Sequence, residues 1–369
     1  MLLEQLGADA GILSQFASFA ADGCVLGRVA VSIRDEYRVL TEAGEWRAEP
    51  TGALLYGAAS QADLPVVGDW VALRAIGGGE AVVQAVLPRR TKFSRRAAGT
   101  REDEQALAAN VDTALLVTGL DGDFNPRRIE RYLTLAIEAG VEPVVVLSKA
   151  DLCADLAGPC GRRRGSLAGG GWRGLDARSF SGGRRVAAIS SLSDEGVAAL
   201  DGVIAPRRTF VLLGSSGAGK STLLNRLAGE ERLRTGTVRE SDSRGRHTTT
   251  HRELIVLASG AILIDTPGMR ELQLWAGREA LDETFDEIAE LATRCRFGDC
   301  SHRVEGGCAV RQALEAGELD PARWENYRKL QGEIRRHELL ADHTAAAAEK
   351  AKWKAIHKAV RVQYKLRGK

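Results

Sequence analysis

The sequence lacks a long apolar run, and no hydrophobic stretch approaches the roughly 18 to 20 residues that a membrane-spanning helix requires. No lysine or arginine precedes Arg28, so the basic start of a secretory signal is missing too. The composition, 44% apolar and 27% charged, is typical of globular proteins and excludes a wholly disordered or collagen-like chain. For 369 residues we therefore expect a cytosolic protein of about two or three domains.

Net charge and cysteine content are both low. Fifty-one basic residues nearly cancel 49 acidic ones, so the net charge alone identifies no partner. Residues 344–369, however, carry eight lysines and arginines against one acid, which predicts a tail that contacts polyphosphate surfaces. Three of the six cysteines cluster between residues 295 and 308. In a cytosolic chain this cluster favours a metal site over disulfides.

Short segments rich in β-branched or alternating apolar residues, separated by turn-forming residues, fill the first part of the chain. Five such strands within about 70 residues predict a small β-barrel, an OB-fold in preference to an SH3-like barrel. The expected strands are residues 25–33, 37–40, 53–56, 69–73 and 81–86.

From about residue 110 the pattern changes to alternating strands and helices, which is typical of an α/β domain with a parallel sheet. The expected strands are 113–118, 143–147, 186–189, 210–213, 254–257 and 262–264, and the expected helices are 127–139 and 222–227. Residues 158–185 interrupt this pattern with seven arginines, nine glycines and one acid. We interpret them as a disordered basic insertion; an RNA-contacting arm and a reading-frame slip remain alternatives.

The strongest motif is G-x-x-x-x-G-K-S, which lies between a predicted strand and a predicted helix. In such a P-loop the backbone N–H groups cradle phosphates, while Lys220 reaches the β- and γ-phosphates and Ser221 binds Mg²⁺. A chance match in a loop is the alternative. The residues expected to bind the nucleotide here are Gly214, Ser215, Ser216, Gly217, Ala218, Gly219, Lys220, Ser221 and Thr222.

Asp265-Thr-Pro-Gly268 follows another buried strand. Downstream of a P-loop, an acid in this position would hold Mg²⁺ through water, and the N–H of Gly268 could sense the γ-phosphate. An ordinary turn after a strand is the alternative.

Ser148-Lys149-Ala-Asp151 looks like the N/T-K-x-D motif that reads guanine. Asp151 can accept hydrogen bonds from N1–H and the N2 amino group of guanine, which adenine cannot supply, and Lys149 would lie across the base. We expect Ser148, shorter than asparagine, to weaken affinity more than base choice. Ser190-Ser191-Leu192 resembles the loop that contacts guanine O6. Each of these motifs alone is weak, and a surface Lys/Asp pair is the default alternative.

The order of these motifs is informative, because the base-reading segments precede the P-loop, whereas ordinary GTPases have the reverse order. The chain therefore looks like a circularly permuted GTPase. It resembles the RsgA family of ribosome small subunit-dependent GTPases over about residues 25–345, except 158–185. The strings that carry the resemblance are Pro65-Val-Val-Gly-Asp69, Leu87-Pro-Arg-Arg-Thr-Lys-Phe-Ser94, Ala109-Asn-Val-Asp112, Arg244-Gly-Arg-His-Thr-Thr-Thr250 and the Cys/His cluster.

The resemblance implies a multidomain α/β protein that acts in late maturation of the 30S subunit, with GTP hydrolysis stimulated by that particle. The expected units are an N-terminal extension (1–23), an OB-fold RNA-binding barrel (24–95), a circularly permuted GTPase domain (105–275), a helical zinc-binding domain (276–345) and a basic tail (346–369).

Residues 245–250 occupy the position of switch I, where Thr249 or Thr250 would join the Mg²⁺ shell. Many GTPases place a water-orienting glutamine after the glycine equivalent to Gly268, but this chain has Met269, so intrinsic hydrolysis should be slow. His247 is the candidate replacement that the resemblance suggests; a solvated loop histidine is the alternative.

Cys295, Cys300, His302 and Cys308 supply three thiolates and one imidazole within 14 residues. Four such ligands suit a closed, tetrahedral and therefore structural Zn²⁺ site. Buried free thiols are the alternative.

The resulting hypothesis is a monomeric GTPase that requires Mg²⁺, holds one structural Zn²⁺, and binds the 30S subunit and its 16S rRNA but no membrane. Two alternatives remain, a GTP-binding RNA switch module whose hydrolysis is dispensable and a P-loop ATPase or kinase. A zinc-dependent nucleic-acid binder with an inactive nucleotide site is disfavoured by the intact P-loop.

Overall fold

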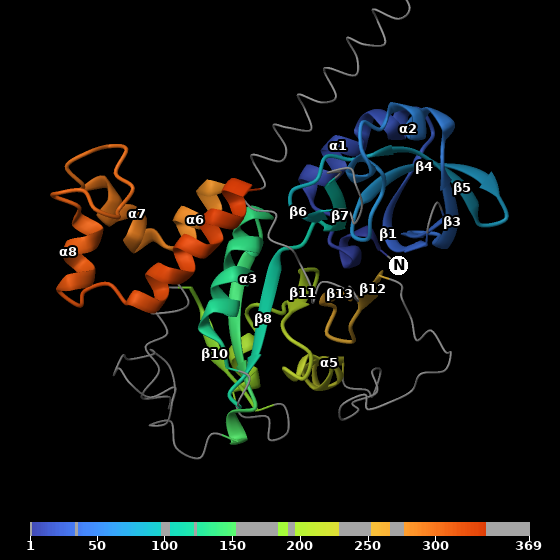
Figure 1. Cartoon of the computed structure of the whole chain (residues 1–369). Helices are drawn as coiled ribbons and strands as arrows, with labels where there is room; N and C mark the ends of the chain where they lie inside the picture. Colours follow the sequence, from blue (N-terminus) through green and yellow to red (C-terminus); the bar gives the residue numbers. More distant parts are fainter. Residues whose placement is uncertain are drawn as a thin grey trace, which may run out of the picture.

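The structure is a computed structural model that describes residues 2–33, 36–96, 104–121, 124–152, 184–190, 196–228, 252–265 and 277–336 (Figure 1). Within these ranges no helix has the length and apolar character needed to cross a membrane. The basic tail 346–369 lies outside the described residues, as does the insertion 158–185 apart from Arg184 and Arg185.

Five strands form the predicted OB-like barrel: β1 (Val25–Ile33), β2 (Glu36–Thr41), β3 (Gly44–Pro50), β4 (Trp70–Gly77) and β5 (Glu80–Val86). They pair in the order β1-β2-β3-β5-β4, and pairing of β1 with β4 closes the barrel. Val29, Val39, Leu73 and Val83, all fully buried, lie in its core. Alternation of apolar and polar residues therefore identified the barrel correctly.

One barrel strand was placed wrongly. Residues 53–56 lie in helix α2 (Gly52–Gly57), whose first turn is capped by the Thr51 side chain accepting from the N–H of Leu54. The missing strand is β3, which carries three charged residues and buries only Ala48. A short apolar run is compatible with a helix as well as a strand. The threonine before the run was the feature of the sequence that indicated a helix.

The segment before the barrel is also folded onto it. The 3-10 helix η1 (Leu3–Leu6) precedes helix α1 (Ala10–Ala21), which Asp9 caps by accepting from the N–H of Ile12. Leu6 and Ile12 are buried against Trp70 and Leu87 of the barrel side. Residues before the first strand thus contribute to the hydrophobic core.

The second part is the predicted α/β domain. Its parallel strands are β8 (Thr113–Gly119), β9 (Glu142–Ser148), β10 (Val186–Ala188), β11 (Thr209–Leu213) and β13 (Ile262–Asp265), and β12 (Arg252–Val256) is antiparallel to β13. Helices α3 (Pro126–Glu138) and α5 (Lys220–Ala228) cover opposite faces, because alternate residues of β8 belong to the core with α3 and the core with α5.

The two parts share one sheet. Strand β12 pairs antiparallel with β1, which gives eleven strands in the order β10-β9-β8-β11-β13-β12-β1-β2-β3-β5-β4. A separate hairpin, β6 (Lys92–Arg96) with β7 (Glu104–Ala109), joins the barrel to the α/β domain. The barrel and the nucleotide-type sheet are therefore hydrogen-bonded to each other.

The C-terminal part is helical, with α6 (Arg278–Thr284), α7 (Asp286–Thr293), α8 (Ala309–Glu315) and a helix over residues 321–336 (Figure 1). The acidic run 279–291 has apolar residues at helical spacing throughout, but it is divided into α6 and α7 at Phe285. Phe285 is fully buried and packs edge-on against Tyr327 at 5.5 Å between ring centroids. The break thus coincides with the packing of this ring, which cannot be predicted from the helical spacing of apolar residues.

Candidate nucleotide and metal sites

The P-loop has the strand–loop–helix context that the motif requires. Strand β11 ends at Leu213, and α5 begins at Lys220. The Lys220 Nζ atom donates to the carbonyl oxygens of Gly214, at 2.8 Å, and Ser215. The lysine is thus held over the loop by groups that a triphosphate could replace as partners.

Two glycines of this loop are required by close approaches. Gly214 has φ +154°, and a Cβ there would lie 2.2 Å from the carbonyl oxygen of Val117. Gly219 has φ +89°, and a Cβ there would lie 3.3 Å from the Ser148 Oγ. Glycine is therefore required at 214 by the close approach to β8, and it is favoured at 219 by the positive φ.

Ser148 joins the base-reading segment to the P-loop. It is buried at the end of β9, and its Oγ lies 2.5 Å from the carbonyl oxygen of Ala218 and 3.2 Å from that of Thr118. The one hydroxyl proton is shared between these two acceptors. A serine in this position therefore retains a link to the P-loop, although it is shorter than the asparagine of the usual motif.

Asp151 lies in the 3-10 helix η3 (Ala150–Leu152), directly after β9. Its Oδ1 atom accepts a hydrogen bond of 2.6 Å from the hydroxyl of Ser190, which is fully buried at the end of β10. The two predicted base-reading segments are thus in contact, and Ser190 fixes the direction of the Asp151 carboxylate.

Lys149 has a partner that the sequence did not reveal. Its backbone is left-handed, with φ +57°, and its Nζ lies 2.5 Å from an Asp121 carboxylate oxygen. Asp121 follows β8, which neighbours β9 in the sheet. An acid just beyond the carboxyl end of the neighbouring strand was the available signal, because such ends meet at one edge of a parallel sheet.

The residues proposed for Mg²⁺ are described only in part. Ser221 is in the first turn of α5, and Asp265 ends β13, the parallel neighbour of β11. Asp265 thus lies at the carboxyl end of the strand beside β11, whose own carboxyl end leads into the P-loop. Five predicted site residues lie outside the described residues: Ser191, His247, Thr249, Thr250 and Gly268.

The cysteine–histidine cluster is assembled. The ligand atoms of Cys295, Cys300, His302 and Cys308 all lie within 4.8 Å of one another. His302 Nδ1 is 3.5 Å from the Cys295 Sγ and 3.4 Å from the Cys308 Sγ. Burial lowers the pKa of His302, which favours the neutral ring that binds metal. Three sulfurs and one imidazole nitrogen suit a single Zn²⁺ with no open coordination position.

The cluster is packed into the helical part. Cys308 caps α8 by accepting from the N–H of Arg311. The His302 ring meets Trp324 edge-on at 5.8 Å, and Trp324 stacks on Tyr327 at 5.6 Å. A metal ion held here would fix both α8 and the helix over residues 321–336.

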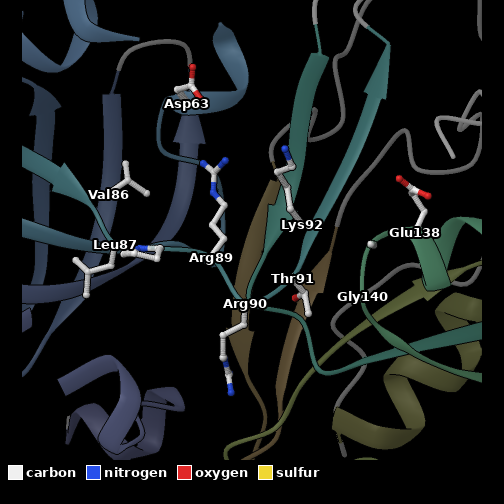
Figure 2. A pocket seen from close by; sticks show the side chains of 11 residues that line it. Asp63, Val86, Leu87, Arg89, Arg90, Thr91, Lys92, Glu138 and Gly140 are labelled. Carbon is white, nitrogen blue, oxygen red and sulfur yellow. The ribbon is translucent and has the colours of Figure 1, made fainter. Parts of the chain in front are cut away.

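A separate open cavity of about 570 Å³ lies between the barrel, the linker after β5 and the end of α3 (Figure 2). Figure 2 shows Arg89 and Arg90 pointing in opposite directions from this linker. Arg89 binds both oxygens of the buried Asp69, at 2.8 and 2.7 Å, and Lys92 pairs with Glu104 at 2.7 Å. The charges of Arg89 and Lys92 are therefore neutralised by carboxylates of the protein itself. We interpret the cavity as the space where the barrel, the linker and α3 meet, and not as a ligand site.

The amino-acid sequence is similar to known circularly permuted GTPases. A family model described as RsgA GTPase matches residues 86–275. A protein named small ribosomal subunit biogenesis GTPase RsgA from Opitutus terrae is 47% identical over 100% of both chains. One of the same name from Xylella fastidiosa (strain M12) is 55% identical over 73% of this chain and 75% of its own length.

Two solved structures share the fold. YjeQ from Thermotoga maritima has a TM-score of 0.60 and 25% identity, covering 84% of this chain and 98% of its own. YloQ, described as a circularly permuted GTPase, has a TM-score of 0.58 and 24% identity, covering 85% and 96%. The permuted order of motifs is thus a property of the fold itself.

Proposed function

Because the chain belongs to the RsgA family of GTPases, we propose that it binds the small ribosomal subunit in the cytoplasm and hydrolyses GTP during late maturation of that subunit. The hydrogen bond between Ser148 and Ala218 carries this proposal. It joins the base-reading segment and the phosphate-binding segment, encoded in reversed order, around one site.

Guanine recognition rests on Asp151. Its carboxylate, oriented by Ser190, accepts from the N1–H and N2 groups of the base, and the stem of Lys149 covers the ring. Adenine offers no such donors, so the hydrogen bonds from N1–H and N2 would be lost, which disfavours ATP. Lys149 is positioned for this role by its ion pair with Asp121.

Phosphate binding rests on the P-loop. Its N–H groups and Lys220 bind the β- and γ-phosphates, and Lys220 leaves the carbonyl oxygens of Gly214 and Ser215 to do so. Ser221 directly, Asp265 through water, and Thr249 or Thr250 would hold Mg²⁺, which neutralises charge on the phosphates.

Hydrolysis joins the oxygen of a water molecule to the γ-phosphorus and breaks the bond to the β–γ bridging oxygen, giving GDP and phosphate. His247 orients this water, since Met269 cannot hydrogen-bond to it. The N–H of Gly268 contacts the γ-phosphate. A site that lacks the usual glutamine turns over slowly alone and needs the ribosomal particle to order it.

The barrel and the zinc-binding helices supply the ribosomal contacts, with 16S rRNA as the target of the barrel and of the basic tail. Zinc held by Cys295, Cys300, His302 and Cys308 is structural, because all four positions are filled by protein. The protein acts as a monomer.

The test is hydrolysis of GTP and of ATP, each with and without purified 30S particles. We expect slow GTP turnover alone, marked stimulation by 30S, and little ATP turnover in either condition. Equal GTP rates with and without 30S would contradict the coupling, and a preference for ATP would establish the ATPase alternative.

A further inference from the structure

Barrel strand β1 lies beside β12 of the GTPase sheet (Figure 1) and contacts that sheet at two places. One contact is a buried side-chain network around Arg28, and the other is a short backbone ladder with β12. The strand therefore links the barrel both to the P-loop strand and to the strand beside Asp265.

The first contact is rigid. Arg28 is fully buried and donates to the carbonyl oxygens of Leu6, Gly68 and Asn110, at 3.1 Å for the last, and to Thr209 Oγ1 at 2.9 Å. Thr209 begins β11, the strand that leads into the P-loop. Breaking this network would leave a buried charge without partners, so it holds β1 and β11 together firmly.

The second contact is marginal. Among the described residues, which on this side begin at Arg252, two residue pairs join β1 to β12, namely Val31 with Glu253 and Ser32 with Arg252. Glu253 is in turn the register partner of Asp265 in β13. Val31, Glu253 and Asp265 thus form one row across three strands, from the barrel to the acid proposed for Mg²⁺.

One ion pair spans this seam. Arg38 of β2 is the other register partner of Val31, and its Nη2 lies 3.6 Å from a Glu253 carboxylate oxygen. Its Nη1 lies 3.4 Å from a Glu45 carboxylate oxygen within the barrel. The three side chains are 40 to 48% exposed.

We infer that the Arg38–Glu253 pair is a positioning contact through which the occupied barrel controls the nucleotide site. Strand β12 begins at Arg252, directly after the segment that contains Thr249 and Thr250, and its register partner strand ends at Asp265. Movement of β12 relative to the barrel therefore shifts Asp265, the acid proposed for Mg²⁺. The anchored P-loop strand stays in place.

This inference rests on the proposed stimulation by the 30S particle and names the contact that transmits it. On the barrel side of the seam Arg38 and Arg47 are register partners, and both are ion-paired within the protein, Arg38 with Glu45 and Glu253 and Arg47 with Glu36. RNA bound elsewhere on the barrel fixes β2 and β1, and the Arg38–Glu253 pair conveys that position to β12. Exposed ion pairs are weak, so the expected effect is graded.

The experiment compares Glu253→Gln with Glu45→Gln. Both substitutions are isosteric, remove one negative charge and take one partner from Arg38, but only Glu253 lies across the seam. We measure kcat and KM for GTP alone and with saturating 30S particles, and 30S binding by sedimentation. For Glu253→Gln we expect about a twofold to fivefold loss in the ratio of stimulated to basal kcat, with basal kcat and 30S binding unchanged. Glu45→Gln should keep the wild-type ratio.

A charge exchange gives a second measurement. Arg38→Glu alone should lower the ratio, and the double variant R38E/E253R should recover about half of that loss or more. Equal ratios in Glu253→Gln, Glu45→Gln and the wild type would overturn the inference alone. A wild-type protein that 30S particles do not stimulate would overturn the proposed function and this inference with it.

Discussion

The hydroxyl of Ser148 lies 2.5 Å from the carbonyl oxygen of Ala218, although the two residues are 70 positions apart. Ser148 ends the strand that precedes Asp151, the residue proposed to read the base, and Ala218 lies inside the P-loop. Their contact shows how a permuted chain closes one site from segments in reversed order. It also makes Ser148 the residue through which the two halves of the site depend on each other.

Replacing Ser148 with alanine should weaken GTP and GDP binding about threefold to tenfold. The loss corresponds to one buried hydrogen bond of about 0.5 to 1.5 kcal/mol, since the carbonyl of Ala218 would be left without this donor. Equilibrium binding of both nucleotides measures the effect.

Ser259→Ala is the matched control, because Ser259 lies in the β12–β13 turn, where its hydroxyl accepts from the N–H of Ala261. It should bind both nucleotides like the wild type. Wild-type affinity in Ser148→Ala would show that the contact does not position the loop.

Short sequence motifs predicted the P-loop glycines, Ser148 and Asp151 as nucleotide-binding residues. The structure brings two of the predicted segments together, because Ser148 contacts Ala218. Asp121 was not predicted, because a single acid after a strand is not a recognisable motif. Its role becomes visible only in the structure, where it pairs with Lys149 after the neighbouring strand.

Features that depend on contacts between distant parts of the chain could not be predicted from the sequence. Pairing of β1 with β12 joins residues more than 200 positions apart, and alternation within a strand does not name its neighbour. Arg28 looked like an ordinary strand residue, yet it is fully buried. The break at Phe285 depends on a ring packed against Tyr327, which helical periodicity does not register.

The Arg28 network predicts different costs for two buried threonines. Thr209 Oγ1 accepts from Arg28, whereas Thr113 Oγ1 has no hydrogen-bond partner among the described residues. Thr209→Val should lower the free energy of unfolding by about 1.5 to 3 kcal/mol, the range for a bond to a charged group. Thr113→Val should be neutral or stabilising, since it removes a buried hydroxyl that pairs with nothing described.

Urea unfolding of both variants measures this difference. The two residues begin adjacent parallel strands and are equally buried, so Thr113→Val controls for the change in shape. Equal destabilisation in the two variants would show that the Arg28 contact contributes nothing to stability.

Glu130 predicts a pH dependence of stability. It lies in α3, where burial raises its pKa to about 7 despite the Arg323 guanidinium at 2.9 Å and the amide of Asn326. A carboxyl whose pKa is raised on folding from its usual 4.5 contributes stability below that value. This contribution is lost as the pH rises through about 7, because the unfolded chain releases the proton more readily.

Denaturant unfolding between pH 5 and pH 8 measures the effect. The free energy of unfolding of Glu130→Gln should fall less over this interval than that of the wild type. Glu333→Gln, which removes a carboxylate paired with Arg131 in the same helix interface, controls for the loss of an ion pair. An unchanged slope in Glu130→Gln would show that Glu130 is already ionised at pH 5.

Zinc removal should unfold the C-terminal helices and spare the nucleotide site. Cys308 both caps α8 and belongs to the ligand cluster, and His302 packs on Trp324 of the next helix, so the proposed zinc ion would hold these helices together. We expect one zinc per chain by elemental analysis and loss of hydrogen-exchange protection in α8 and residues 321–336 after chelation, with GTP binding retained.

Cys300→Ser should lose the ion, whereas Cys24→Ser, a free cysteine outside the cluster, should keep it. Full protection of these helices in metal-free protein would mean that the thiols and the aromatic stack hold the domain together without an ion.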